Sequence, residues 1–259
     1  MAGTSSDCNP ETAPTVWLCR EPEADVLSCP DWLTDYEQAT VAKFSGPRQR
    51  EYLSSRWLIR QAIGHGSQCP AGHCEPVSGR PVASARPEGW HLSLSHSGGL
   101  SGCAVSGQPG IGLDLEPLDR HPHWQKVVRR WFTPDEQAWL LANNSHEDFL
   151  RVWTLKEAWL KATGRGIAGN LQTLEVRSDF SLYGDRHDAG WQAASGELAG
   201  FLVTLVYRHD HLLLPSGGLL AGPTADLDLD RPVPPDSPLV FSRHRPITPA
   251  PELKRNPYG

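Results

Sequence analysis

Acidic side chains at two places in the sequence have a spacing that would let them act together. Segment 111–116 reads Ile-Gly-Leu-Asp-Leu-Glu and carries Asp114 and Glu116. Segment 153–161 reads Trp-Thr-Leu-Lys-Glu-Ala-Trp-Leu-Lys and carries Glu157. Alternate residues of a β-strand share a face, so Asp114 and Glu116 are expected to point the same way. If the second segment forms a helix that packs on this strand, the three carboxylates converge on one hard divalent cation such as Mg²⁺.

The second segment also brings a lysine to the same place. Residues four apart stack on one face of a helix, so Trp153, Glu157 and Lys161 form a single stripe. The Lys161 ammonium group can then neutralise the phosphates of a substrate. Lys156 lies about 100° around the helix from Glu157 and is expected on the helix surface. The alternative is a solvated strand edge with an ordinary ion pair between Glu157 and Lys161.

These two segments resemble the paired signatures of the surfactin-type 4′-phosphopantetheinyl transferases, written (V/I)G(I/V)D and W-(S/T)-x-K-E-(S/A)-x-x-K. The distance between the segments also fits the family. Ser95 and His96 resemble the family's Ser-His element, and Gly79-Arg80-Pro81 stands where Gly-Lys-Pro is usual. The resemblance covers about residues 45–210 and is specific because the motifs occur in combination.

The resemblance implies transfer of the 4′-phosphopantetheine arm from coenzyme A to a serine of an apo acyl or peptidyl carrier protein, with release of 3′,5′-ADP. It assigns the magnesium ligands to Asp114, Glu116 and Glu157. Glu157 would also act as the base, directly or through a water, and Lys161 would stabilise the departing phosphate. Such chemistry needs neutralised phosphates, a proton acceptor and an in-line approach.

Contacts to coenzyme A are implied for three further residues and for Lys161. Ser95 and Arg80 match family positions that contact the phosphate and nucleotide portions, and His96 would donate a hydrogen bond to the pyrophosphate. Arg80 keeps the charge of the commoner lysine and adds a planar fork of donors. Without the resemblance, a strand end that satisfies local backbone groups is the favoured interpretation of Ser95 and His96.

A carrier protein is expected to be acidic beside its serine, and a basic face is available for it. Lys126, Arg129 and Arg130 have helical spacing just after the first signature and would share one side of a helix. The same face could be ordinary solvent-exposed surface. The residues do not distinguish fatty-acid, polyketide and peptide-synthetase carriers, and a monomer is expected.

Composition and charge limit the other possibilities. The formal charge of −6 argues against general nucleic-acid binding, which normally needs a basic face. No apolar run reaches the roughly 20 residues that span a membrane. The polar segment 1–15 does not resemble a signal peptide, so a cytoplasmic protein is expected. Cysteines stand at 8, 19, 29, 69, 74 and 103, and free thiols are expected. Cys69, His73 and Cys74 could form half of a zinc site, but no second ligand pair has matching spacing.

The order of predicted elements indicates an α+β fold. Helices are predicted at 34–44, 48–63, 133–142 and 145–164, and strands at 90–94, 102–106, 111–116, 174–177, 191–194, 201–207 and 211–214. Capping-box residues open the first and third of these helices. The second carries Arg48, Arg50, Arg56 and Arg60, which either form a solvated face or help to hold phosphates.

Each half of the sequence therefore reads as helices followed by short strands. The expected organisation is a disordered N-terminus over 1–14, an N-terminal half over 15–116, a C-terminal half over 117–217 and a Pro-rich flexible tail over 218–259. The resemblance implies that the halves are related by a pseudo-twofold axis, with the active site between them. No repeat is evident in the residues themselves.

Two other functions remain open from the residues. One is a coenzyme A binding protein that has no transfer activity. The other is a metal-dependent nuclease, which also combines one acidic residue with a later acidic residue and a lysine. In a nuclease the lysine usually follows two residues after the acid, whereas here Lys161 follows Glu157 by four.

Overall fold

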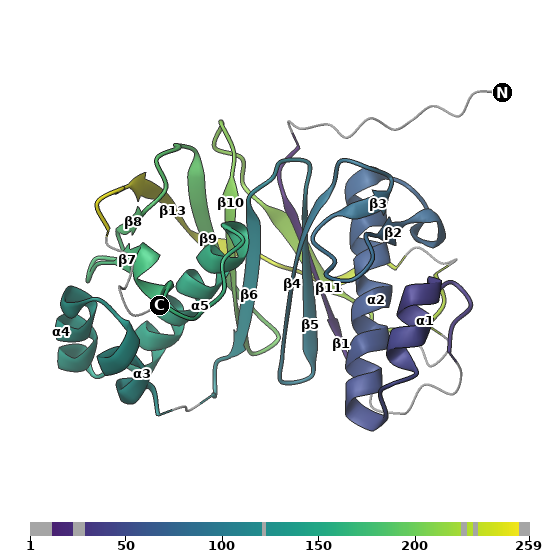
Figure 1. Cartoon of the computed structure of the whole chain (residues 1–259), viewed down its shortest axis with the longest axis horizontal. Helices are drawn as coiled ribbons and strands as arrows, with labels where there is room; N and C mark the ends of the chain where they lie inside the picture. Colours follow the sequence, from purple (N-terminus) through teal and green to yellow (C-terminus); the bar gives the residue numbers. More distant parts are fainter. Residues whose placement is uncertain (1–11, 23–28, 121–122, 224–226, 230–232, 254–259) are drawn as a thin grey trace. The chain divides into compact units, whose positions relative to one another are not determined.

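The computed structural model describes residues 12–22, 29–120, 123–223, 227–229 and 233–253. Two compact units are present (Figure 1). The first comprises the chain up to Pro109 together with Leu214–Leu239, and the second comprises Gly110–Leu213 and the residues from Val240 onward. Each unit combines helices with a mixed or antiparallel sheet, so the predicted α+β class is confirmed. Among the described helices, none has the length and apolar character needed to cross a membrane.

The sheet of the first unit has the strand order β12-β11-β1-β5-β4. Its strands are β1 (Thr15–Arg20), β4 (His91–Ser97), β5 (Leu100–Ser106), β11 (Ser216–Leu220) and β12 (Pro235–Pro238). A separate hairpin joins β2 (Glu75–Pro76) to β3 (Ser84–Arg86). The helices are α1 (Asp35–Val41), α2 (Gly46–Ser67) and the 3₁₀ turn η1 (Ala71–His73). The long helix α2 packs on β1 and β5 and buries the core of this unit (Figure 1).

The sheet of the second unit has the order β6-β10-β9-β13-β8-β7. Its strands are β6 (Ile111–Pro117), β7 (Leu174–Val176), β8 (Leu182–Gly184), β9 (Trp191–Leu198), β10 (Phe201–Arg208) and β13 (Phe241–Pro249). Its helices are α3 (Trp124–Trp131), α4 (Pro134–Asn143), α5 (His146–Ala162) and the 3₁₀ turn η2 (Leu171–Thr173). Helix α5 packs on β6 and β10, and a largely aromatic and aliphatic core fills the space beneath it.

Side-chain caps open the helices where the sequence predicts them. Thr34 Oγ1 accepts from the Glu37 amide, and Glu37 Oε2 accepts from the Thr34 amide, which is the reciprocal capping box. Thr133 and Glu136 form the same arrangement at the start of α4. These caps satisfy backbone donors that have no partner within the helix, so both helix starts are set locally.

The predicted end of the second helix is wrong. Helix α2 continues through Gly64 to Ser67 and ends at Gln68, which has a left-handed φ of 60°. A Cβ atom on Gly64 would lie 2.8 Å from the Cys69 carbonyl oxygen, so this glycine permits a close backbone approach and does not terminate the helix. The four arginines predicted on this helix do not form one solvated face, because Arg60 is buried and forms a 2.7 Å ion pair with Glu37.

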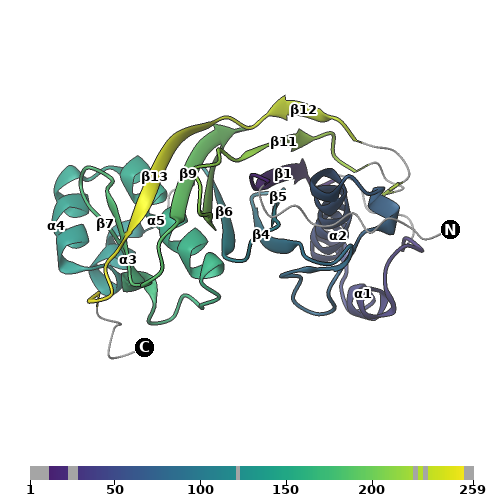
Figure 2. The same ribbon diagram turned by 90° about the horizontal axis from the view of Figure 1, so that it is seen from above.

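The flexible tail predicted over 218–259 is also wrong for much of its length. Strand β11 pairs in parallel with β1, and β12 pairs with β11. Strand β13 pairs with β8 and with β9, and Figure 2 shows β13 alongside β9. In β13 only Ile247 has a buried aliphatic side chain, and the strand shows little apolar alternation. Backbone pairing therefore holds this strand more than side-chain burial does.

Two smaller differences concern one predicted strand and the boundary between the units, and one prediction lies outside the described residues. The strand predicted at 211–214 is absent from the described residues, where 211–215 has no regular structure. The boundary between units falls between Pro109 and Gly110, because β6 pairs with β10 along its whole length. Residues 1–11 of the predicted disordered N-terminus, with Cys8, lie outside the described residues.

Candidate active site

Strand β6 and helix α5 approach each other unusually closely at Gly112. A Cβ atom at this position would lie 2.0 Å from the Ala158 carbonyl oxygen and 2.4 Å from the Ala162 amide nitrogen. No other residue could occupy the position without moving the helix away from the strand. The glycine of the first signature therefore sets the distance between the two elements that carry the chemistry.

This contact brings the predicted residues of the two signatures together. Lys161 Nζ donates to Asp114 Oδ1 at 2.9 Å and to the Leu113 carbonyl oxygen at 2.8 Å. One face of α5 thus lies along β6, as the spacing of the helical stripe predicts. All three carboxylates of the predicted site are buried, although the strand alternation suggested a more solvated face for two of them.

Trp153 contributes to the site through its ring nitrogen. Its Nε1 donates to Glu116 Oε1 at 3.2 Å, and the rest of the half-buried ring packs against the core of the unit. The sequence places this tryptophan on the stripe with Glu157 and Lys161, but no contact with a carboxylate was predicted for it. Its position one turn before Glu157 on the same stripe is the signal that could have shown the second role.

Glu157 is a carboxylate of this site with a strongly raised pKa. Its pKa is raised to about 7, mainly by burial and then by the negative charges of Asp114 and Glu116, while Lys161 and Arg120 act in the opposite direction. A carboxyl group with a pKa near neutral pH is well suited to accept a proton at that pH.

Arg120 is a site residue that sequence reasoning missed. Its guanidinium group forms a very short ion pair with Glu116, and about half of its side chain is exposed. Arg120 follows Glu116 by four residues and lies just beyond the end of β6 at Pro117. The ion pair between them therefore depends on the turn of the chain after this strand. Arg120 and Lys161 thus act as internal counter-ions for Glu116 and Asp114.

The donor set suits a hard divalent cation. Carboxylate oxygens are the ligands that Mg²⁺ prefers. Asp114, Glu116 and Glu157 are buried and repel one another, so a cation bound among them would relieve that repulsion. As the side chains stand, however, the described residues contain no group of three His, Cys, Asp or Glu side chains arranged to hold a metal ion. The lysine and arginine contacts would have to shift for a cation to share these oxygens.

Lys156 differs from its predicted place on the helix surface. It is fully buried, and its Nζ lies 2.7 Å from Glu136 Oε1 and 2.7 Å from the Leu171 carbonyl oxygen. Burial lowers the pKa of Lys156, and the Glu136 carboxylate opposes that change. Glu136 Oε1 also accepts from the Val176 amide at 2.9 Å. Lys156 therefore joins α5 to α4 and β7 rather than facing a substrate.

The residues implied in coenzyme A binding belong to the first unit. Ser95 is buried near the end of β4, and the neighbouring His96 is exposed, with Nε2 3.3 Å from Glu51 Oε1. Glu51 also forms a very short ion pair with Arg48. Arg80 is exposed in the loop between β2 and β3. Ser95 and His96 are therefore adjacent on one strand, while Arg80 stands on a separate loop of the same unit.

The expected basic face is present on α3. Lys126, Arg129 and Arg130 are exposed, whereas Trp124 and Val128 of the same helix are buried in the core. The guanidinium group of Arg130 stacks on the Trp131 ring at 4.8 Å. This helix therefore presents positive charge to solvent within the unit that contains the three carboxylates.

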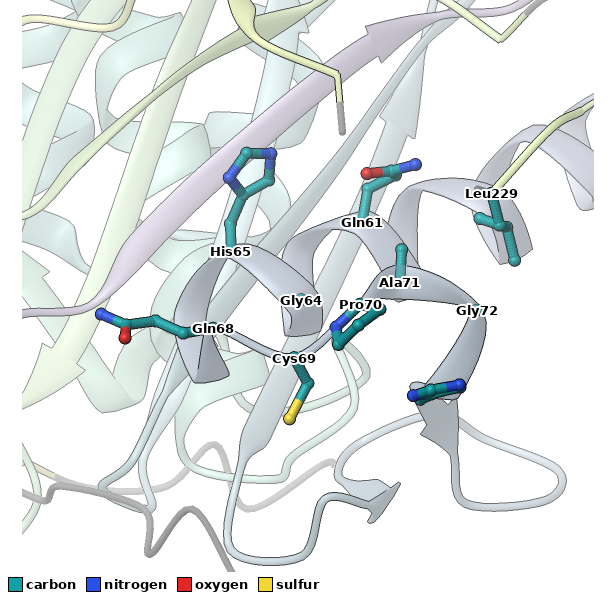
Figure 3. Close-up of a pocket in the computed structure, with 10 residues that line it drawn as sticks. Gln61, Gly64, His65, Gln68, Cys69, Pro70, Ala71, Gly72 and Leu229 are labelled. Atoms are coloured by element: carbon teal, nitrogen blue, oxygen red, sulfur yellow. The ribbon is translucent and has the colours of Figure 1, made fainter. Parts of the chain in front are cut away.

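In the described structure, the cysteine-rich loop does not bring Cys69, His73 and Cys74 together as a group of three that could hold a metal ion. Cys74 is buried and its thiol lies 3.5 Å from the Pro70 carbonyl oxygen. Burial raises the pKa of Cys74 to about 11, which disfavours the thiolate that zinc requires. Cys69 lines a pocket at the end of α2 (Figure 3), but no metal-binding group of three side chains occurs in the described parts of the chain.

Comparisons with known proteins identify the family to which this chain belongs. Residues 110–206 match the family model described as the 4′-phosphopantetheinyl transferase superfamily. The 4′-phosphopantetheinyl transferase HetI of Nostoc sp. is 32% identical over 60% of this chain and 69% of its own length. A Synechocystis sp. protein with the provisional name of a 4′-phosphopantetheinyl transferase is 28% identical over 71% of this chain and 80% of its own length.

A relative from Bacillus subtilis matches a shorter region. The 4′-phosphopantetheinyl transferase Sfp is 33% identical over 38% of this chain and 44% of its own length. The α+β fold and the paired strand and helix signatures define a phosphopantetheinyl transferase type of protein. The chain belongs to the 4′-phosphopantetheinyl transferase superfamily, as the resemblance of its motifs predicted.

Proposed function

We propose that this protein transfers the 4′-phosphopantetheine arm of coenzyme A to a serine of an apo carrier protein, in a magnesium-dependent reaction. The observation that carries the proposal is the buried group of three carboxylates beside Lys161, in which the pKa of Glu157 is raised to about 7. Membership of the superfamily supports the same reaction.

The proposed reaction replaces a phosphoanhydride bond of coenzyme A by a phosphodiester bond to the carrier serine. The carrier serine oxygen forms a bond to the phosphorus that bears the pantetheine arm, and the bond from that phosphorus to the bridging oxygen breaks. 3′,5′-ADP then leaves, and the serine proton passes to a base. Because the transition state is stabilised mainly by positioning and by charge neutralisation, the protein needs correctly placed charges more than a covalent nucleophile.

Glu157 is the proposed base. A pKa near 7 makes its carboxylate a better proton acceptor than an ordinary glutamate at neutral pH. Trp153 and Lys161 lie one turn on either side of it and contact Glu116 and Asp114, which fixes this face of α5 on β6. Lys161 is proposed to release Asp114 and to stabilise the phosphate of the departing 3′,5′-ADP.

Asp114, Glu116 and Glu157 are the residues that would hold magnesium, which when bound neutralises charge on the pyrophosphate oxygens. Arg80, Ser95 and His96 are proposed to contact coenzyme A. His96 would exchange its contact with Glu51 for one with a phosphate. Lys126, Arg129 and Arg130 are proposed to meet an acidic carrier.

The test is incubation of the protein with coenzyme A and a panel of apo carrier proteins, followed by intact-mass measurement. A mass gain of one phosphopantetheine arm on at least one carrier, only when Mg²⁺ or Mn²⁺ is supplied, supports the proposal. Coenzyme A binding without any mass gain would favour the alternative of a binding protein that lacks transfer activity. Cleavage of single-stranded DNA in the same buffer would favour a metal-dependent nuclease.

A further inference from the structure

A small pocket lies within the second unit, between helix α5 and the part of the sheet formed by β9 and β13. The residues that line it all belong to this unit and to the described part of the chain. Arg151 and Leu155 line it from α5, at about 120° and about 160° around the helix from Glu157. The pocket therefore lies on a different side of α5 from the three carboxylates.

The pairing of two strands explains why there is space here. In the antiparallel ladder of β13 and β9, Arg243 stands opposite Ser195 and Arg245 stands opposite Ala193, and all four residues line the pocket. Opposite residues of a ladder point to the same face of the sheet and lie close together. Because Ser195 and Ala193 have small side chains, they leave room beside the two arginines.

The other residues that line the pocket give it an apolar wall. Leu155, Leu182 and Ala193 are buried, and Phe180 is half-buried. The ring centroid of Phe180 lies 5.8 Å from that of Trp139, so the ring is held against the core. Phe180 also has a left-handed φ of 60°, which a residue other than glycine adopts only where its surroundings hold it. The wall is therefore formed before any ligand arrives.

Two of the arginines in the pocket already have acidic neighbours. Arg151 forms a very short ion pair with Glu147 and lies 4.0 Å from Asp148. Arg243 Nη1 lies 3.9 Å from Glu197 Oε1, and both of these side chains are more than 40% exposed. Such a long and solvated pair contributes little, so Arg243 is free to meet another anion.

Arg245 differs from these two arginines. Its Nη1 donates to the carbonyl oxygen of the neighbouring His244 at 3.0 Å, and among the described residues it has no carboxylate partner. A guanidinium group presents a planar fork of donors, which fits a carboxylate through two parallel hydrogen bonds. Arg245 and Arg243, two positions apart on one strand, thus offer a place for one negative charge at the edge of an apolar wall.

The size of the pocket limits the ligand further. Its volume is about 100 Å³, well below the roughly 300–1,000 Å³ of sites that hold drug-sized molecules. A nucleotide or coenzyme A is too large for it. Inorganic phosphate would fit, but it would leave the apolar wall uncovered. A carboxylate that carries a short hydrocarbon chain matches the volume, the charge and the wall together.

We propose that this pocket binds a small monocarboxylate with a short apolar chain. The carboxylate accepts hydrogen bonds from Arg245 and Arg243, and the chain packs on Leu155, Leu182 and Phe180. Burial of the chain removes apolar surface from water, which a bare anion cannot do. The site uses none of the residues proposed for transfer, so it stands whether or not the transfer reaction is confirmed.

The test uses butyrate as the probe, butyramide as its uncharged analogue and inorganic phosphate as an anion without a hydrocarbon chain. Each compound is titrated into the whole protein, in which the leucines are isotope-labelled, and the methyl signals of Leu182 are followed. These signals are assigned by comparison with Leu182→Met. We expect saturable shifts with butyrate, and at least tenfold weaker binding of butyramide and of phosphate.

Two variants locate the site. Arg245→Gln should weaken butyrate binding at least fivefold, and because Arg245 is exposed the variant should melt as wild type does. Arg208→Gln removes a partly exposed arginine from β10 of the same unit and is the matched control, which should bind butyrate as wild type does. The proposal is overturned if butyramide or phosphate binds as tightly as butyrate, if Arg245→Gln binds butyrate as wild type does, or if butyrate causes no saturable shift in the folded wild-type protein.

Discussion

The Lys156 ammonium group lies 2.7 Å from Glu136 Oε1, and both side chains are fully buried. The lysine belongs to the second signature, yet it bonds to α4 and to backbone carbonyls rather than facing the three carboxylates. It holds α5 in place from a side of the helix about 100° away from Glu157. One signature thus combines the catalytic stripe with the contact that supports its helix.

Lys156→Met should destabilise the protein strongly, by about 3–5 kcal/mol, because Glu136 would be left as an unpaired buried charge. The double variant Lys156→Met with Glu136→Gln should recover part of this loss, since no charge is then stranded. Chemical denaturation of the two proteins measures the difference. Equal stability of Lys156→Met and wild type would contradict the buried pair.

Glu157→Gln should abolish most transfer while the protein remains folded. The amide keeps the shape of the side chain but can neither accept the serine proton nor balance a cation, and loss of a general base costs on the order of 10²–10⁴ in rate. Single-turnover transfer to an apo carrier, beside circular-dichroism melts, measures both properties. Glu147→Gln, at an exposed position near the start of the same helix, is the control and should retain activity. Normal transfer by folded Glu157→Gln would remove this residue from the mechanism.

The metal-free protein should lose stability as pH rises from about 4.5 to about 7. Glu157 has its pKa raised from 4.5 to about 7, first by burial and then by Asp114. Within this window the folded state holds a proton that the unfolded state has released, so folding is favoured at the lower pH. Thermal melts in chelator at several pH values should show a smaller decline for Glu157→Gln. Parallel pH profiles for the two proteins would refute the raised pKa.

Arg120→Gln should bind Mg²⁺ several-fold more tightly than wild type. The arginine is a counter-ion for Glu116, so removing its charge leaves more negative potential for a cation. Isothermal titration with MgCl₂ in the absence of coenzyme A measures this directly. Arg208→Gln removes a similarly exposed charge paired with Asp188 and should leave the affinity unchanged. Weaker binding by Arg120→Gln would mean that the arginine supports the metal site instead.

Gly112→Ala should destabilise the second unit by about 1–3 kcal/mol or more, because the added methyl group overlaps the backbone of α5. Displacement of the helix should also separate Lys161 from Asp114 and reduce transfer. Gly166→Ala, where no atom lies within 4 Å of the added carbon, is the matched control. Denaturation midpoints of the two variants compare them. An unchanged midpoint for Gly112→Ala would show that the close approach is not required.

Local signals in the sequence predicted much of this structure. The capping residues of α1 and α4 act within a few positions of one another, so their effect on helix starts can be read directly from spacing. The stripe on α5 and the alternation in β6 likewise depend on periodicity alone. These features predict that the strand face with Asp114 lies against the helix face with Lys161. In the structure the two side chains form a 2.9 Å contact.

Contacts between distant residues were not predictable in this way. Lys156 looks like a surface lysine until Glu136, twenty positions earlier, is known to lie beside it. Strand β13 has almost no apolar alternation, so its sequence does not predict a strand. Backbone pairing with β9 and β8 holds it in the sheet.

The path of the chain has a consequence for any attempt to divide this protein. The backbone leaves the first unit after Pro109, returns at Leu214 and leaves it again after Leu239. A single proteolytic cut therefore cannot release either unit as a complete piece. A truncation after residue 213 would remove strands from both sheets at once, so the strands beyond this point are structural members of each unit and not a dispensable appendage.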